Sequence, residues 1–213
     1  PVVPLARHPP GRPALVDMMF SQLAGRKYGA ILADPPWRFQ TYSSKGWNRS
    51  NVRHYPILET ADIMALPVAP LAADDCCLFL WTSDPLLPEA LEVVRAWGFE
   101  YKTVGFYWIK SRHDEPGLFP LPFRPTLGLG YWTRANPEMC LLATKGSPKR
   151  KAADVRRLIV APRREHSRKP DLVNGEIERL VPGPYLELFA RRRATGWDSW
   201  GDDVDKFSEK EMA

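Results

Sequence analysis

Four consecutive residues, Asp34, Pro35, Pro36 and Trp37, suit the transfer of a group to a planar amine. An amine on an aromatic ring is a poor nucleophile, because its lone pair is delocalised into the ring. A site that activates it must accept hydrogen bonds from both N–H groups and hold the nitrogen in line with the donor. The Asp34 carboxylate and the Pro35 carbonyl can accept these bonds, and the two prolines stiffen the loop. The Trp37 indole offers a face on which an extruded base such as adenine can stack.

The same four residues have a simpler interpretation, because proline-rich turns are common after strands. Their position favours a functional role. Tyr28–Ala33 is a short apolar run, typical of a buried parallel strand, and it stops abruptly at Asp34. Ligand sites in open α/β sheets lie at the carboxyl ends of the strands. We therefore expect a catalytic loop at 34–37 that can hold an exocyclic amine such as that of adenine.

The elements that must position this loop alternate between strands and helices. Apolar and β-branched runs predict five further strands, over residues 76–81, 103–109, 138–144, 158–161 and 185–190. Helical spacing predicts helices over residues 60–66, 85–97 and 170–180. Specific expectations are Thr60 as an N-cap, Gly98 as a C-cap residue, and a buried face formed by Leu172, Val173, Ile177 and Leu180. This alternation predicts an α/β fold with a mostly parallel sheet.

The chain has 213 residues, a length typical of one domain. We expect a flexible arm over residues 1–13, a single domain over 14–204 and a mobile tail over 205–213. Two long loops, 38–56 and 111–136, interrupt the domain, and long loops in compact domains are usually functional or disordered. No apolar run approaches the roughly 20 residues needed to cross a bilayer. The first 13 residues do not resemble a secretory signal, so a cytoplasmic location without membrane contact is expected.

Composition argues against several classes of site. The three cysteines lack the Cys-x-x-Cys spacing of zinc sites, the histidines are scattered, and no metal is expected. Buried free thiols indicate a reducing compartment. No Gly-x-Gly-x-x-Gly fingerprint follows a strand, so no dinucleotide cofactor is expected.

Charge and aromatic residues indicate a nucleic-acid partner. The net charge is +5, and the segment 145–169, here called the basic segment, holds ten Lys or Arg residues against two acids. The two long loops mix arginines with aromatic residues, which suits phosphate contact and base stacking. Among these, Arg38, Trp132 and Arg134 are candidate substrate contacts. A solvated basic face and ordinary loop composition are the competing interpretations.

Several blocks of the sequence together resemble a known family. They are KYGAILADPPW at 27–37, HYPILETADIMALPV at 54–68, LFLWTSDPLLPEAL at 78–91, WGFEYKTVGFYWIK at 97–110, GLGYWTRANPEMCLLATKG at 128–146, REHSRKPDLVNGEIERL at 164–180 and ELFARR at 187–192. This order resembles the adenine-N6 methyltransferases related to the catalytic subunit of the eukaryotic messenger-RNA adenosine methyltransferase, in particular their short microbial or phage members. The resemblance implies a Rossmann-like methyltransferase fold with helices on both faces of the sheet, and S-adenosylmethionine as cofactor.

The resemblance also implies roles for individual residues. Asp34, Pro35, Pro36 and Trp37 match the catalytic tetrapeptide, and Asp34 is also expected to contact the cofactor. Lys169 matches a lysine at the methionine end of the cofactor. Further cofactor-binding matches are Glu187, Phe189 and Arg191, and Tyr55 matches an aromatic residue beside the target base.

Three cofactor-binding matches depart from the family pattern. Asp202 and Asp203 follow Gly201 where the family commonly has Asn followed by Gln or Glu, and Asp cannot donate as Asn does. Asp17 aligns with a family acidic residue only after a shift of one position.

We therefore expect a methyltransferase acting on N6 of adenine in nucleic acid, with DNA favoured over RNA because the resemblance is to short microbial or phage members. One alternative is an inactive methyltransferase-like scaffold that binds nucleic acid or a partner. Another is an enzyme that methylates a protein glutamine amide, as related tetrapeptides with Asn first do. A monomer, a homodimer and a complex with a partner subunit all remain open.

Overall fold

A computed structural model describes residues 20–38, 58–111, 126, 132–165, 168–201 and 204–207. Strands and helices alternate along the chain, and their bounds are as follows: β1 Tyr28–Ala33, α2 Thr60–Met64, β2 Ala72–Thr82, α3 Leu87–Ala96, β3 Glu100–Ser111, β4 Glu138–Lys145, β5 Leu158–Pro162, α4 Leu172–Leu180, β6 Tyr185–Leu188 and β7 Trp197–Trp200. Short 3-10 turns, Ala69–Leu71 and Asp84–Leu86, precede β2 and α3.

The strands form one sheet in the order β5-β3-β4-β2-β1-β6-β7. β1 pairs in parallel with β2 and β6, β6 with β7, and β3 with β5. β4 runs antiparallel to both of its neighbours. The predicted mostly parallel sheet is therefore confirmed, and the carboxyl ends of six strands share one edge with the amino end of β4.

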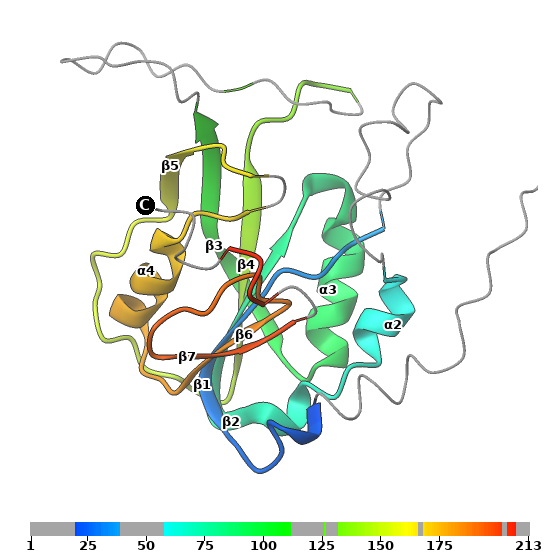
Figure 1. Cartoon of the computed structure of the whole chain (residues 1–213), viewed down its shortest axis with the longest axis vertical. Coiled ribbons are helices and arrows are strands. Elements are labelled where there is room, and N and C mark those ends of the chain that lie inside the picture. The colour runs from blue at the N-terminus through cyan, green and yellow to red at the C-terminus, as the bar shows by residue number, and fades with distance from the viewer. Residues whose placement is uncertain are drawn as a thin grey trace, which may run out of the picture.

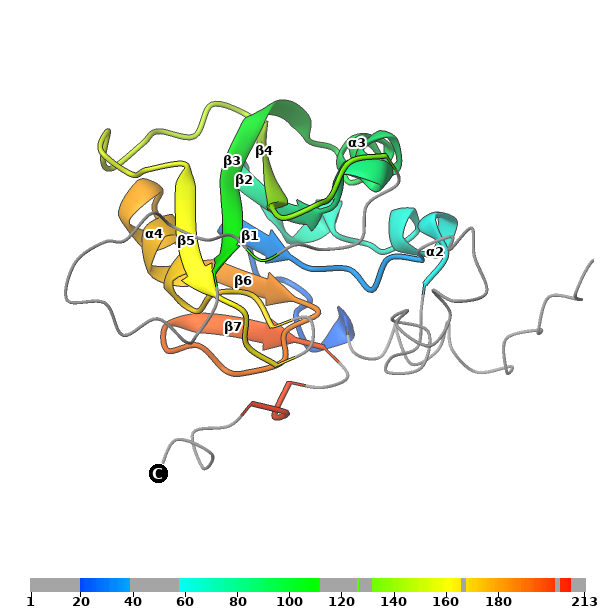
Figure 2. The same cartoon turned by 90° about the horizontal axis from the view of Figure 1, so that it is seen from above.

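Helices cover both faces of this sheet, as the turned view shows (Figure 2). α2 and α3 pack on one face against a core that includes Ile31, Leu78 and Leu141. α4 packs on the other face, against Leu32 and Phe79 among others (Figure 1). The two cores follow from alternation along β1 and β2, where successive side chains point to opposite faces and both sets are apolar. The predicted α/β, Rossmann-like architecture is confirmed.

The helix ends explain how α3 is positioned. Gly98 has φ 80°, a left-handed conformation that glycine adopts without steric cost, and it ends the helix as predicted. The indole N–H of Trp97 donates to the carbonyl of Ile63 at 2.9 Å and so joins α3 to α2. Thr60 is the first residue of α2, and Glu59 is its N-cap, so the predicted cap is one residue off.

Two other expectations need correction. β7 was missed, because Trp197–Trp200 places Asp198 and Ser199 between two tryptophans and shows no apolar run. In α4 the buried residues are Val173, Asn174 and Ile177, whereas Leu172 is 47% exposed. The buried face is rotated toward Asn174, and a rotation of about 100° per residue turns Leu172 outward.

The predicted arm and most of the two predicted long loops lie outside the described residues. Within the described ranges, no helix has the length and apolar character needed to span a membrane.

Candidate active site

A pocket lies at the sheet edge where the strands β1 and β6 end. Its wall combines residues from β1, β2, β6, the turn into α4 and the short segment after β7, namely Leu32, Asp34, Trp81, Arg168, Lys169, Pro170, Asp171, Val173, Asn174, Glu187, Phe189, Arg191, Arg192 and Phe207. Asp34 and Lys169 are 135 positions apart in the sequence and meet here. The edge is where an open parallel sheet is expected to bind ligands.

Lys169 is the central cation of this site. Its ammonium donates to both carboxylate oxygens of Asp34, at 2.8 Å each, and lies 3.3 Å from a carboxylate oxygen of Glu138. Its Nζ is also 5.4 Å from the centre of the Trp81 ring. Burial disfavours the charged ammonium and would lower the pKa of Lys169. The attraction of the Asp34 and Glu138 carboxylates is stronger than this effect, so the pKa of Lys169 is raised. The lysine is therefore charged, and it holds the carboxylate of Asp34 from both oxygens.

Glu138 supports Lys169 from the amino end of β4. Burial alone would raise its pKa, but the ammonium groups of Lys169 and Lys110 together lower it to about 2. Lys110 in β3 forms an ion pair with the other carboxylate oxygen, and its own backbone carbonyl accepts a hydrogen bond from Asn136 at 3.1 Å. The result is a row of alternating charges that starts at Asp34 and continues into the sheet.

The backbone of the 34–37 loop is fixed by hydrogen bonds. The N–H of Trp37 donates to the carbonyl of Pro35 at 2.8 Å, and the N–H of Leu58 donates to the carbonyl of Pro36 at 3.2 Å. A carbonyl oxygen has two lone pairs, so that of Pro35 can accept one further bond. The Asp34 N–H donates to the carbonyl of Leu188, the last residue of β6, at 3.4 Å.

The expected role of Trp37 as an open stacking face does not hold. Its side chain is 7% exposed and belongs to the core beneath α2 and α3. Its indole N–H donates to the backbone carbonyl of Trp81 at 2.8 Å. A residue buried and bonded in this way anchors the loop to β2, so Trp37 is a structural residue of the site.

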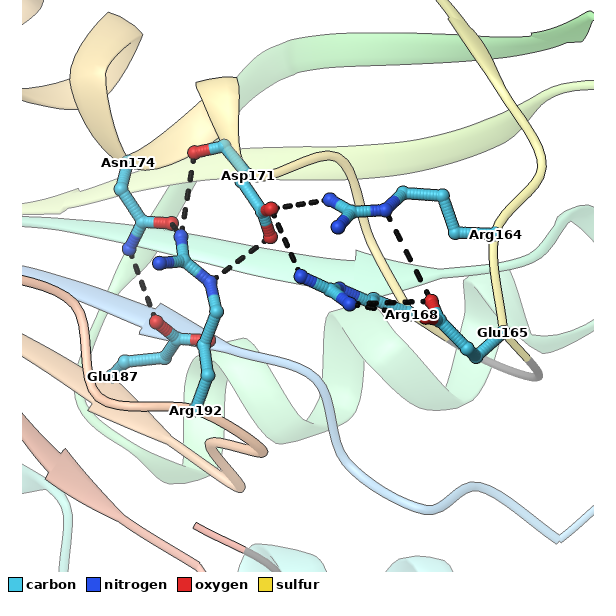
Figure 3. Close-up of polar contacts among 7 residues, drawn as sticks. All are labelled: Arg164, Glu165, Arg168, Asp171, Asn174, Glu187 and Arg192. Atoms are coloured by element: carbon cyan, nitrogen blue, oxygen red, sulfur yellow. Dashed lines mark hydrogen bonds and ion pairs between the residues drawn. The ribbon is translucent and has the colours of Figure 1, made fainter. Parts of the chain in front are cut away.

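A second group of pocket residues surrounds the end of β6. Glu187 accepts a hydrogen bond from the side-chain amide of Asn174 at 3.0 Å (Figure 3). Burial raises the pKa of Glu187, against the opposing effects of Asn174 and Arg192. Phe189 has φ 60°, which turns the chain away from the strand, and its ring packs edge-on against Trp200. This turn ends β6 at Leu188, two residues before its predicted end at residue 190.

Comparison with known proteins identifies this arrangement. The model of the MT-A70 family matches residues 28–203, which is most of the chain. The chain belongs to the MT-A70 family.

Two relatives of this MT-A70 chain illustrate the range of the family. The Type II methyltransferase M.MunI of a Mycoplasma species is 34% identical over 89% of this chain and 83% of its own length. The mouse N(6)-adenine-specific methyltransferase METTL4 is 32% identical over 86% of this chain and 39% of its own length.

A third relative is the human N(6)-adenosine-methyltransferase catalytic subunit METTL3, which is 30% identical over 84% of this chain and 28% of its own length. The chain thus spans most of the Mycoplasma protein and well under half of the two mammalian ones. It is an MT-A70 methyltransferase.

The structure of this MT-A70 methyltransferase brings together five of the residues predicted from its sequence: Asp34, Lys169, Glu187, Phe189 and Arg191 all line the pocket. The predicted substrate contacts do not join them. Arg38 forms an exposed ion pair with Glu59, and Trp132 is fully exposed, as is much of Arg134. Asp17, Tyr55, Asp202 and Asp203 lie outside the described residues.

Several pocket residues were not predicted. They are Asp171, Asn174, Arg168 and Arg192. Glu138, which supports Lys169 from outside the pocket lining, was not predicted either. One signal was available: Asp171 and Asn174 are three positions apart at the start of a predicted helix, and they lie two and five positions after Lys169, near the same edge of the sheet. Glu138 carried no such signal, because a charged residue at the start of a strand is ordinary.

Within the described part of the chain, no cluster of three or more His, Cys, Asp or Glu residues is arranged to hold a metal ion.

Proposed function

We propose that this MT-A70 protein transfers the methyl group of S-adenosylmethionine to N6 of adenine in nucleic acid, with DNA preferred over RNA. One observation carries the proposal. The carboxylate of Asp34 lies in a pocket at the end of β1, bonded through both oxygens to the ammonium of Lys169. The backbone carbonyl that follows it, that of Pro35, belongs to the same rigid loop. Two acceptors on consecutive residues of one loop would match the two N–H groups of an exocyclic amine.

The pocket suits the cofactor on chemical grounds. Glu187 is an acceptor-only group when ionised, which matches the paired hydroxyls of a ribose. The Asp34 carboxylate and the Lys169 ammonium carry the charges that complement the amino and carboxylate groups of an amino acid. Phe189 and Arg191 add an aromatic ring and a cation to the same wall. When bound, the cofactor supplies an electrophilic methyl group on a sulfonium centre.

The residues of the chain have defined tasks in this scheme. Asp34 and the Pro35 carbonyl accept the two N–H bonds of the amine and favour the tetrahedral geometry in which its lone pair can attack. A carboxylate has about four lone-pair sites, so Asp34 can bond the amine while Lys169 holds it. The nitrogen–carbon bond forms as the carbon–sulfur bond breaks, without a covalent enzyme intermediate. The surplus proton leaves the amine during or after transfer, so Asp34 need not be a strong base.

The basic segment supports nucleic acid as the substrate. It leads from β4 through β5 to Lys169, so it ends at the pocket. Its residues Lys149, Arg150 and Arg156 are exposed, as phosphate contacts must be. The preference for DNA rests on the short microbial relatives, since the Mycoplasma methyltransferase matches this chain over 83% of its own length.

The test is transfer of a labelled methyl group from S-adenosylmethionine to double-stranded DNA, single-stranded DNA, RNA and a protein lysate. Each substrate is assayed with the wild type, with Asp34→Asn and with Asp154→Asn. The matched control Asp154 also forms an ion pair, but its side chain is 75% exposed and lies outside the pocket lining. Digestion to nucleosides then locates the label.

Label in N6-methyladenine from DNA, lost with Asp34→Asn by at least about 100-fold and kept with Asp154→Asn, is the expected result. Label from RNA alone would overturn the DNA preference and keep the chemistry. Label in the protein fraction alone would establish the glutamine-type reaction. If no substrate is labelled and S-adenosylmethionine gives no heat of binding, the protein is an inactive scaffold and the proposed activity is wrong.

A further inference from the structure

An amide side chain links an acid to a base inside the pocket. Asn174, in the first turn of α4, donates from Nδ2 to a carboxylate oxygen of Glu187 at 3.0 Å. Its Oδ1 accepts a hydrogen bond from the guanidinium of Arg192 at 2.8 Å. All three residues line the pocket, and the close-up shows the amide of Asn174 bonded to Glu187 on one side and to Arg192 on the other (Figure 3). Asn174 is 8% exposed, so these bonds form away from solvent.

The neighbours of this amide allow it only one orientation. A guanidinium has donors alone, and an ionised carboxylate has acceptors alone. The amide oxygen must therefore face Arg192 and the amide nitrogen must face Glu187. A flip by 180° about the last side-chain bond would place two donors together and two acceptors together, each at the cost of a buried unsatisfied group. The bonds from Arg192 to Asn174 and from Asn174 to Glu187 therefore fix the orientation of the Glu187 carboxylate.

Arg192 is itself held from the other side by Asp171. Its Nε lies 3.0 Å from Asp171 Oδ1, and its Nη2 donates to the Asp171 backbone carbonyl at 3.4 Å. The second carboxylate oxygen of Asp171 bonds Arg168 at 3.1 Å and also pairs with Arg164 (Figure 3). Asp171 thus joins three guanidinium groups. Two of them belong to the basic segment, and the third orients Asn174.

We propose that Asn174 and Arg192 are positioning residues, which aim the Glu187 carboxylate at the ribose hydroxyls of the adenosyl cofactor. This inference rests on the proposed function, because it takes Glu187 as the ribose ligand. Without the Asn174 donor, the Glu187 carboxylate is free to rotate or to take up a proton. Rotation moves its oxygens away from the ribose hydroxyls, and protonation turns one acceptor oxygen into a donor. Arg192 acts one step further away, by keeping the amide in its single productive orientation.

A purely structural role is the competing explanation, since the same bonds tie α4 to β6. The two roles differ in which ligand groups they affect. A loosened fold would weaken binding of every adenosyl ligand by the same factor. A misdirected Glu187 would weaken only the part of binding that comes from the ribose hydroxyls. The difference in affinity between a ligand with these hydroxyls and one without them would then become smaller.

The experiment compares S-adenosylhomocysteine with its 2′,3′-dideoxyribose analogue by isothermal titration calorimetry. The proteins are the full chain as wild type, Asn174→Ala, Asn174→Asp, Arg192→Leu and Arg179→Leu. Asn174→Asp keeps the shape of the side chain and replaces the donor by an acceptor, which guards against a cavity effect. Arg179→Leu is the matched control, because Arg179 also pairs with carboxylates but lies on the outer part of α4 with its side chain 48% exposed. Thermal unfolding without ligand checks that each variant is folded.

The wild type should bind the dideoxy analogue about 10- to 100-fold more weakly than S-adenosylhomocysteine, the usual effect of losing hydrogen bonds to a charged acceptor. Asn174→Ala and Asn174→Asp should reduce this ratio to below about 3-fold, Arg192→Leu should reduce it partly, and Arg179→Leu should leave it unchanged.

A ratio that stays at the wild-type value in both Asn174 variants, while both ligands weaken together, would overturn the positioning role and leave the proposed function intact. A wild type that discriminates neither ligand, although it binds both, would remove Glu187 as the ribose ligand and the inference with it. A wild type that binds neither ligand would instead overturn the proposed function.

Discussion

Replacing Lys169 by methionine is the sharpest test of the charge arrangement at the pocket. The substitution keeps most of the aliphatic volume and removes the ammonium that bonds Asp34 twice at 2.8 Å and approaches Glu138 at 3.3 Å. Removing one partner of a buried ion pair costs about 3–5 kcal/mol. The side chains of Asp34 and Glu138 are 21% and 27% exposed, and Glu138 keeps Lys110, so we expect a loss of about 2–3 kcal/mol at pH 7.5.

The loss should depend on pH in a defined direction. In the wild type the pKa of Glu138 is lowered to about 2, so its stabilising effect is present above the ordinary value of 4.5 and is lost as the pH falls toward 2. Without Lys169 the pKa of Glu138 moves back up, so protonation at pH 4 relieves the unpaired charge. The raised pKa of Lys169 itself lies above 10.5, outside this range. The difference in free energy of unfolding should therefore fall to about 1 kcal/mol at pH 4.

Urea unfolding followed by tryptophan fluorescence measures both values. Lys102→Met is the control, because Lys102 pairs with Glu100 at the surface, where such pairs contribute about 0–1 kcal/mol. A Lys169→Met difference that is equal at pH 7.5 and pH 4 would show that the effect comes from packing and would refute the electrostatic reasoning.

Three further predictions concern stability and reactivity. Gly29→Ala should lower the free energy of unfolding by about 1–3 kcal/mol, because a Cβ there would lie 2.7 Å from a backbone carbonyl oxygen. Gly175→Ala should raise the free energy of unfolding by about 0.5–1 kcal/mol, because its Cβ meets no atom within 4 Å. Urea titrations in which both substitutions shift the free energy in the same direction would contradict this pair of predictions. Trp37→Phe removes a buried hydrogen-bond donor and should cost about 1–2 kcal/mol, and an unchanged melting temperature would contradict the role of Trp37 as an anchor of the loop. All three cysteines are buried, and burial raises the pKa of Cys140 well above its ordinary value, so a thiol reagent should label the native protein slowly and find three thiols in urea.

The sequence was most informative where a single physical signal dominated. Tyr28–Ala33 was predicted with its observed bounds, because an apolar run between two basic residues and a proline pair is typical of a buried strand with sharp ends. Gly98 was predicted as a helix end, because a left-handed residue after a helix favours glycine. The residue types of Asp34 to Trp37 suggested a catalytic loop, and that role stays a prediction.

Contacts between distant segments were less accessible. Family resemblance placed Lys169 near the methionine end of the cofactor, but no local pattern encodes its ion pair with Asp34. The bonds that fix Asn174 depend on the rotation of α4 about its axis. The apolar residues Val173 and Ile177 leave this rotation uncertain by about one residue, so the sequence did not show whether Leu172 or Asn174 faces inward. The burial of Trp37 was missed because an aromatic residue beside two prolines suits both a stacking face and a core anchor. The predicted division into arm, domain and tail and the predicted cytoplasmic location remain predictions.

The central place of β1 in the sheet has a consequence for how the protein is made. β1 is the first strand of the described chain, yet one of its two neighbours is β6, whose residues pair with it only after more than half of the chain has been synthesised. Until β6 emerges from the ribosome, one side of β1 carries unpaired backbone groups on an entirely apolar strand, the kind of edge that promotes aggregation. Pairing over such a sequence separation also closes slowly. A nascent chain stalled before β6 should therefore be prone to aggregation, and we expect chaperones to bind it during synthesis.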